Sequence, residues 1–276
     1  MNKILSKRKL AENIIEYIFD APKVVRHAKA GQFVILRVDE TGERVPFSIC
    51  NTDPQNGTLT LLIQTLGATT MKLAKLNQGD SVSDITGPLG TASHLDAYTN
   101  PILVGGGIGC ADVYPQAKMF QVLGRPCDVI IGARNKDLIL YENEFQAVAK
   151  NLYLTTDDGS YVRKGFVTDV LKERIEQGGN YDVVFAVGPV PMMKAICNLT
   201  ENYNLKTIVS MNTLMVDGTG MCGCCRVTVD GATKYACVDG PEFDGHLIDW
   251  DEAINRSKIY KGYEVEHICR LTGEKK

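Results

Sequence analysis

The chain contains 276 residues, 44% of them hydrophobic, with 30 basic and 33 acidic side chains. A chain of this length can bury a large core and is long enough for two domains and an appendage. Its nearly balanced charge argues against a protein that binds nucleic acid or an anionic membrane. The nine cysteines are odd in number and five stand singly, which argues against a disulfide framework and predicts buried thiols, a metal site and a reducing cytoplasm.

The first 19 residues predict one strand of alternating apolar and polar side chains, interrupted by Glu12 and Glu16. They lack the apolar centre and the cleavage site of a signal peptide. The sequence also has no run of about 18 uncharged apolar residues that would cross a membrane. We therefore expect a soluble chain with no membrane partner.

Short alternating runs continue to about residue 98, for example at 32–38 and 57–67, and turn signals such as residues 53–57 separate them. This pattern predicts a small antiparallel barrel over residues 1–98. One helix is expected within it at 68–76, where Thr69 or Thr70 can cap the amino end.

From residue 99 the pattern changes to wholly apolar strands that alternate with helices. We expect strands at 101–109, 127–134, 151–159 and 181–188, and helices at 115–124, 141–150, 167–177 and 190–203. Strands without alternation are buried on both faces, as in a parallel sheet covered by helices. Residues 99–212 are therefore predicted to form a Rossmann-like α/β domain. Residues 213–276 are predicted to form a small cluster segment, with a closing helix at 248–260.

The pattern D-x4-C-x2-C-x11-C joins Asp217, Cys222, Cys225 and Cys237. With cysteine at the first position it would match the pattern that binds a [2Fe–2S] cluster in plant-type ferredoxins, and aspartate carries the same single negative charge as a thiolate. Glycines at 218, 220 and 223 would let backbone N–H groups approach the inorganic sulfide. The motif therefore predicts a [2Fe–2S] site that transfers single electrons.

Two alternatives remain open at this motif. Cys222, Cys224, Cys225 and Cys237 could form a four-cysteine zinc site, although zinc prefers two C-x2-C pairs on separate hairpins. Asp217 could be an ordinary turn aspartate before a glycine. In the iron–sulfur interpretation, Cys224 is a spare thiol that does not bind the cluster.

A glycine run, Gly105-Gly106-Gly107-Ile108-Gly109, follows one predicted strand and precedes a helix. Such glycines let backbone N–H groups and the positive end of a helix approach a pyrophosphate. The full G-x-G-x-x-G spacing is absent because Asp112 occupies the position of the third glycine, so a purely structural turn is an equal alternative. A second turn, Gly188-Pro189, ends a later strand and would face the same cleft.

Two segments of the predicted barrel carry side chains suited to a flavin nucleotide. The run Arg44-Val45-Pro46-Phe47-Ser48 offers an arginine, an aromatic ring and a hydroxyl, although an edge strand with a proline would look the same. The run Gln64-Thr65-Leu66-Gly67-Ala68-Thr69-Thr70 places a glycine and two hydroxyls at a helix amino end. These could bind an anion or simply cap the helix.

The chain has a predicted barrel, a predicted α/β domain and a cluster motif in this order. In this it resembles the ferredoxin–NADP+ reductase superfamily over essentially its whole length. Within it the sequence is similar to the electron-transfer subunit of dihydroorotate dehydrogenase. It is more similar still to the small subunit of NADH-dependent reduced ferredoxin:NADP+ oxidoreductase, also called sulfide dehydrogenase beta subunit. The former has four cysteines, whereas the latter has an aspartate and three cysteines, followed by the stretch seen here from Val238 to Asp244.

The resemblance implies roles for particular residues. FAD is expected to bind Arg44, Pro46, Phe47 and Ser48, with its diphosphate near Gln64, Gly67, Thr69 and Thr70 and the barrel closed beneath it at Gly87. NAD(H) or NADP(H) is expected at Gly105, Gly106, Gly107, Ile108, Gly109, Gly188 and Pro189. Asp157 and Asp158 would line the same cleft, and Arg134 is a candidate for contact with a 2′-phosphate.

These parts imply an electron-transfer flavoprotein subunit in which NAD(H) exchanges a hydride with FAD and the cluster carries single electrons away. We expect no side chain to act as an acid or base. The resemblance implies a larger flavin and iron–sulfur partner subunit that bifurcates electrons and reaches ferredoxin. The alternatives are a dihydroorotate dehydrogenase electron-transfer subunit and a zinc-stabilised nucleotide-binding module without catalysis.

Overall fold

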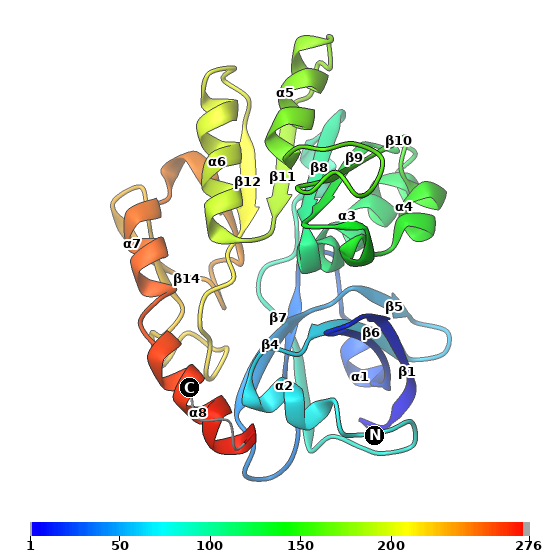
Figure 1. The fold of residues 1–276 in the computed structure, drawn as a ribbon, viewed down its shortest axis with the longest axis vertical. Helices are drawn as coiled ribbons and strands as arrows, with labels where there is room; N and C mark the ends of the chain where they lie inside the picture. Colours follow the sequence, from blue (N-terminus) through cyan, green and yellow to red (C-terminus); the bar gives the residue numbers. More distant parts are fainter. Residues whose placement is uncertain (1, 273–276) are drawn as a thin grey trace.

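The structure is a computed structural model that describes residues 2–272. The predicted domains at 1–98 and 213–276 include residue 1 and residues 273–276, which lie outside the described residues. An antiparallel unit is followed by an α/β unit, and the C-terminal segment runs along both (Figure 1). The predicted fold class is confirmed.

The antiparallel unit consists of two sheets, with strand orders β1-β2-β6-β5 and β4-β3-β7. Its strands are β1 (Ile4–Ala11), β2 (Ile14–Asp20), β3 (Phe33–Arg37), β4 (Arg44–Ser48), β5 (Asn51–Asp53), β6 (Thr58–Gln64) and β7 (Asp84–Leu89). Both sheets contribute to one core, which includes Tyr17, Val34 and Leu61. Two short helices accompany the sheets, α1 (Pro22–Val25) and α2 (Ala68–Leu73), so the helix expected at 68–76 ends three residues early.

The first 19 residues form a hairpin rather than the single strand expected from their alternation. Strands β1 and β2 pair in antiparallel register, with Arg8 opposite Glu16. Glu16 is tolerated in an otherwise apolar strand because Arg8 donates two hydrogen bonds to it, each of 3.0 Å, and the Tyr141 hydroxyl donates a third at 2.5 Å. Since Tyr141 belongs to the α/β unit, this carboxylate joins the two units.

The α/β unit is built on a six-stranded sheet in the order β10-β9-β8-β11-β12-β15. The parallel strands are β8 (Pro101–Gly106), β9 (Asp128–Ala133), β10 (Asn151–Thr156), β11 (Val183–Val187) and β12 (Thr207–Ser210). The connecting helices are α3 (Cys110–Val122), α4 (Glu142–Val148), α5 (Val167–Glu176) and α6 (Val190–Glu201). The four predicted strand–helix pairs are confirmed, whereas β12 is too short to give a distinct pattern in the sequence.

The C-terminal segment completes the sheet of the α/β unit. Strand β15 (Glu242–Asp244) pairs antiparallel with β12, and β13 (Arg226–Val229) and β14 (Ala232–Tyr235) form a separate hairpin. The helix expected at 248–260 is shorter, α7 (Trp250–Arg256), and a further helix, α8 (Lys261–Thr272), begins beyond the expected range. Single 3₁₀ turns lie at η1 (Leu95–Ala97), η2 (Gly107–Gly109), η3 (Lys136–Leu138) and η4 (Gly245–Leu247). Among residues 2–272 no helix has the length and apolar character needed to span a bilayer.

Candidate functional site

Asp217, Cys222 and Cys225 lie in an irregular loop between β12 and β13, whereas Cys237 lies between β14 and β15. Gly218, Gly220 and Gly223 have φ angles of +77°, +83° and +68°, a conformation that other residues rarely adopt. A Cβ atom on Gly218 would also lie 2.5 Å from Ile35 Cδ1 of β3. The glycines therefore let the loop turn back on itself and pack against the antiparallel unit.

The predicted cluster ligands form two close pairs. Cys225 Sγ and Cys237 Sγ are buried and lie 3.2 Å apart. Asp217 lies beside Cys222, because its carboxylate accepts the N–H of that residue at 3.0 Å. No three His, Cys, Asp or Glu side chains within residues 2–272 converge closely enough to hold a single metal ion. The four predicted ligands thus lie two by two, and Cys224 is a further neighbour of Cys222.

This grouping fits a [2Fe–2S] centre, because each of its two irons takes two protein ligands. Backbone N–H groups also point at the sulfur atoms, as they do around a cluster. The N–H of Cys237 donates to Cys225 Sγ at 3.5 Å, and the N–H of Cys224 lowers the pKa of the Cys222 thiol. Burial raises the pKa of Cys237 to about 12, whereas the N–H of Gly220 acts in the opposite direction.

Two residues of the loop bear on the alternatives. The Asp217 carboxylate also accepts the N–H of Thr219 at 2.9 Å, which lowers its pKa and is the behaviour of a turn aspartate. An ionised carboxylate has further lone pairs, so this turn role is compatible with binding iron. Cys224 is half-buried, and the nearby Cys222 thiol raises its pKa.

The predicted flavin motif lies on β4, which pairs with β3. Side chains of a strand alternate between faces, so Arg44, Pro46 and Ser48 share one face. Phe47 lies on the other face, where it packs against the core of the antiparallel unit. The Ser48 hydroxyl hydrogen-bonds the carboxyl of Asp112 on α3. The motif thus brings the arginine and the serine together but places the aromatic ring apart from them.

The second flavin segment runs from Gln64, at the end of β6, into α2. Gly67 is the N-cap residue of α2, and Thr70 Oγ1 accepts its N–H at 3.0 Å in a capping-box arrangement. Thr69 Oγ1 instead donates to Glu43 Oε2 at 2.7 Å. Of the two expected capping residues, Thr70 is therefore the one whose side chain caps. In the neighbouring sheet, a Cβ atom on Gly87 would lie 2.8 Å from Val34 Cγ1.

The two glycine turns of the α/β unit lie side by side, because β8 and β11 are neighbours in the sheet. A Cβ atom on Gly109 would lie 2.3 Å from the carbonyl oxygen of Val187. One on Gly188 would lie 3.2 Å from Gly106 Cα. Pro189 is the N-cap residue of α6. The structure thus joins the two turns at the carboxyl edge of the sheet.

Arg134, Asp157 and Asp158 gather at the carboxyl ends of the next two strands, β9 and β10. The N–H groups of Asp157 and Asp158 donate to the carbonyls of Ala133 and Arg134 at 3.0 and 3.2 Å. All three charged side chains are exposed. A hydrogen bond from Ser160 lowers the pKa of Asp158.

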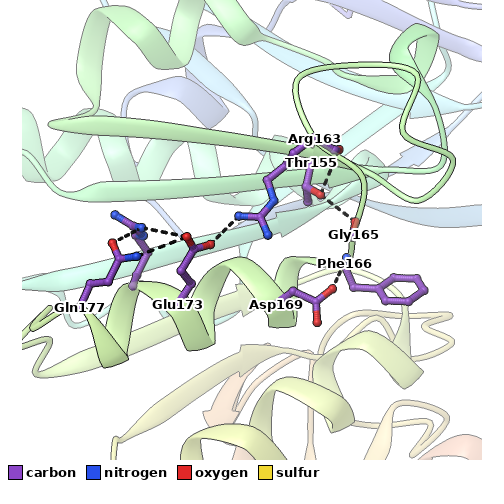
Figure 2. Close-up of polar contacts among 8 residues, drawn as sticks. Thr155, Arg163, Gly165, Phe166, Asp169, Glu173 and Gln177 are labelled. Carbon is purple, nitrogen blue, oxygen red and sulfur yellow. Dashed lines mark hydrogen bonds and ion pairs between the residues drawn. The ribbon is translucent and has the colours of Figure 1, made fainter.

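The loop between β10 and α5 is anchored on that helix (Figure 2). Arg163 Nη1 lies 2.5 Å from Glu173 Oε2, and Asp169 Oδ2 accepts the N–H of Phe166 at 2.8 Å. The ring of Phe166 points away from the helix and is 61% exposed. The loop therefore presents the ring of Phe166 and the carboxylates of Asp157 and Asp158 near the carboxyl end of β10.

A polar cluster that the sequence analysis missed lies where three parts of the chain meet. Glu242 Oε1 on β15 accepts from Ser93 Oγ at 2.5 Å and from Gln116 Nε2 at 2.6 Å. Asp112, which bonds Ser48, lies one turn before Gln116 on α3. Burial raises the pKa of Glu242 to about 7 and that of Asp112 to about 6. Two features of the sequence could have indicated this cluster. Asp112 occupies the position of the third glycine in the G-x-G-x-x-G pattern, and Glu242 lies in the stretch from Val238 to Asp244 that the resembled small subunit shares.

Three family models match the chain in the order in which the structure arranges its parts. An oxidoreductase FAD-binding domain matches residues 2–94, and an oxidoreductase NAD-binding domain matches residues 103–198. The iron–sulfur cluster binding domain of dihydroorotate dehydrogenase B matches residues 212–249. FAD, NAD(H) and an iron–sulfur cluster are therefore the cofactors and substrate of this chain.

Relatives match over nearly the full length. An uncharacterized protein of Clostridium beijerinckii is 50% identical over 96% of this chain and 92% of its own length. A dihydroorotate dehydrogenase B (NAD(+)) electron transfer subunit homolog of Thermotoga maritima is 40% identical over 99% of this chain and 98% of its own.

A solved structure of an NADH-dependent reduced ferredoxin-NADP oxidoreductase, studied for flavin-based electron bifurcation, matches with a TM-score of 0.93 and 40% identity. That match covers 99% of this chain and 98% of the other. The Thermotoga maritima relative is named as a homolog of an electron transfer subunit. This chain belongs to the family of dihydroorotate dehydrogenase B electron transfer subunits and their homologues, which are flavin and iron–sulfur oxidoreductases that use nicotinamide nucleotides.

Proposed function

We propose that this chain is the small subunit of an electron-bifurcating NADH-dependent reduced ferredoxin:NADP+ oxidoreductase. The observation that carries the proposal is the match to a structure of that enzyme over 99% of the chain at a TM-score of 0.93. The ligand motif that begins at Asp217 supports it, because the resembled small subunit also has an aspartate and three cysteines.

In this function the chain divides into a flavin domain at 1–98, a nucleotide domain at 99–212 and a cluster segment at 213–276. Bound FAD supplies the exchange between hydride transfer and single-electron transfer. Arg44 would pair with its diphosphate, as guanidinium groups do with phosphates, and Ser48 would hydrogen-bond its ring. Pro46, with Gln64, Gly67, Thr69, Thr70 and Gly87, would complete the flavin site, whereas Phe47 packs against the core on the other face of β4.

The nucleotide would bind at the carboxyl edge of the parallel sheet, where such ligands bind in open α/β folds. The backbone N–H groups of the joined turns, Gly105 to Gly109 and Gly188-Pro189, would bind the diphosphate. Asp157 and Asp158 would line the ribose side, with Arg134 beside them. We propose NADH as the nucleotide, in line with the oxidoreductase that the chain resembles.

The cluster would be held by Asp217 and Cys222 on one iron and by Cys225 and Cys237 on the other. Cys224 would remain unbound. A four-cysteine zinc site is less well supported, because zinc needs four ligands around one point and no three candidate side chains within residues 2–272 converge in that way.

The partner would be a larger subunit that carries its own flavin and iron–sulfur clusters and reaches ferredoxin. The segment that contains the exposed Cys222 also carries exposed apolar side chains, which would form the docking surface: Leu214, Val216, Met221 and Val238, of which Met221 is 88% exposed. All nine cysteines are unpaired thiols, which supports a cytoplasmic complex.

The test is an anaerobic absorption and electron paramagnetic resonance spectrum of the purified chain before and after NADH is added. Bleaching of the flavin together with a reduced [2Fe–2S] signal is the expected result. A chain that contains zinc and no flavin would overturn the proposal.

A second candidate is an electron-transfer subunit of dihydroorotate dehydrogenase. It is favoured by the cluster-domain match and by a subunit of Geobacillus thermodenitrificans that is 36% identical over 87% of this chain. Purifying the chain with its native partner separates the two candidates. A complex that oxidises dihydroorotate would support the second, whereas one that oxidises NADPH with NAD+ and ferredoxin would support the first.

A further inference from the structure

A chain of polar groups crosses the junction of the three parts of the molecule. Its members are Ser48 on β4, which acts on the Asp112 carboxyl on α3, and Gln116, one helical turn further along α3, which donates to Glu242 on β15. Asp112 and Glu242 are not bonded to one another, but the Asp112 charge acts on Glu242. Ser93, between β7 and η1, closes it by donating to Glu242 Oε1 at 2.5 Å and by accepting from Gln116 Nε2 at 3.3 Å. No single unit of the fold contains this chain, so it exists only when the three are assembled.

The two carboxyl groups in this chain lack a cationic partner. Among the described residues, the groups that act on Glu242 are Ser93, Gln116 and the Asp112 carboxyl. Ser48 hydrogen-bonds Asp112, and the other titratable groups that face it are the buried thiols of Cys50 and Cys110. Both side chains are half-buried, and the partial loss of hydration without a cationic partner favours the protonated form of both groups.

Gln116 provides a second observation that points to a proton. This side chain is 1% exposed, and its Oε1 atom has no hydrogen-bond donor within the described part of the chain. A buried acceptor without a donor costs about 1–3 kcal/mol. Because Gln116 Nε2 already lies 2.6 Å from Glu242 Oε1, a proton on the Glu242 carboxyl would supply the missing donor.

We propose that Asp112 and Glu242 form a redox-linked proton site, which binds a proton from solvent when the flavin site gains two electrons and releases it when they leave. This inference rests on the proposed function, since it takes Ser48 to lie against the flavin. Hydride transfer brings two electrons and one proton, and so leaves the flavin site more negative by one charge. Added negative charge favours protonation of nearby carboxylates, and the solvent proton restores the balance.

The experiment is the pH dependence of the flavin reduction potential, measured by anaerobic spectroelectrochemistry on the full chain with its cofactors. The wild type is compared with Asp112→Asn, with Glu242→Gln and with free FAD in the same buffers. We expect the wild-type potential to fall more steeply with pH than that of either variant or of free FAD. The excess slope should approach one proton per flavin, which is about 30 mV per pH unit for a two-electron couple.

Asp96→Asn is the matched control, because Asp96 is an exposed carboxyl on η1, close in sequence to Ser93. Its slope should equal that of the wild type. Equal slopes in the wild type and free FAD, with flavin bound and reduced by NADH, would overturn this inference alone. A wild-type chain that NADH does not reduce would overturn the proposed function and this inference with it. If one variant loses flavin, the other variant and the comparison with free FAD still decide the question.

Discussion

At some positions two backbone segments lie so close together that only glycine fits, and Gly109 is an example. Its φ angle is −60°, which any residue can adopt, so its requirement for glycine is purely one of space. The sequence indicates a glycine turn here, but it does not reveal that the carbonyl of Val187, from a distant strand, is the obstacle. Residue types and spacing predict the ligand loop in a similar way, whereas the pairing of Cys225 with Cys237 emerges only from the fold.

Gly109→Ala should therefore separate the two glycine turns. Overpacking of this kind costs about 1–3 kcal/mol, and a shift of the turn should weaken NADH binding by about tenfold or more. Thermal unfolding and NADH titration measure the two effects. Gly262→Ala on α8 is the control, because its Cβ meets no atom within 4 Å and alanine favours a helix. Unchanged NADH affinity in Gly109→Ala would show that the turns do not form the nucleotide site.

Asp217→Cys tests the unusual ligand. The variant should assemble a cluster with four sulfur ligands, and its electron paramagnetic resonance spectrum should differ from that of the wild type, because ligand type alters the electronic structure of the cluster. Cys224→Ser should leave the spectrum unchanged. Identical spectra for Asp217→Cys and the wild type would mean that Asp217 acts only as a turn residue.

At the scale of elements, the apolar strands and the helices that follow them are evident from the sequence because each is long enough to show its period. Strand β12, with four residues, and β15, with three, are not evident, because pairing with neighbours rather than pattern creates them. The β10–α5 loop has no period at all. Its shape depends on side-chain bonds to α5, chiefly that of Arg163 with Glu173.

Arg163→Ala should loosen this loop with little loss of global stability, because both partners are about 40% exposed and solvent screens such pairs. The affinity for NADH should fall several-fold if the loop lines the nucleotide site. Isothermal titration measures the affinity. Lys172→Ala, which removes an exposed pair with Glu176 on the same helix, should leave it unchanged. An equal effect of the two variants would argue against a specific role for the loop.

At the scale of the whole molecule, the Glu242 cluster links assembly to pH. The pKa of Glu242 is about 7 in the folded chain, above its ordinary value of 4.5, so the folded state holds an extra proton between these pH values. Stability should therefore fall as pH rises from about 4.5 to about 7 and then level off, by at most about 3 kcal/mol from this group. The raised pKa of Asp112 acts in the same direction.

Glu242→Gln should remove this part of the pH dependence, because an amide does not titrate in the range. Melting temperatures of the wild type and the variant between pH 4.5 and 8 provide the measurement. The two curves should converge at the acid end and separate toward neutral pH, with the variant the more stable there. Parallel curves across the range would contradict the assignment of a proton to Glu242.

The pairing of β12 with β15 also affects the order in which the chain folds during synthesis. The ribosome releases strands β8 to β12 first, and their sheet keeps an open edge of unpaired N–H and C=O groups until residue 244 emerges. When β15 docks, it closes the chain from residue 211 to 241 into a loop that contains Asp217, Cys222, Cys225 and Cys237. Completion of the nucleotide sheet and enclosure of the iron-binding loop are therefore a single late step of biosynthesis.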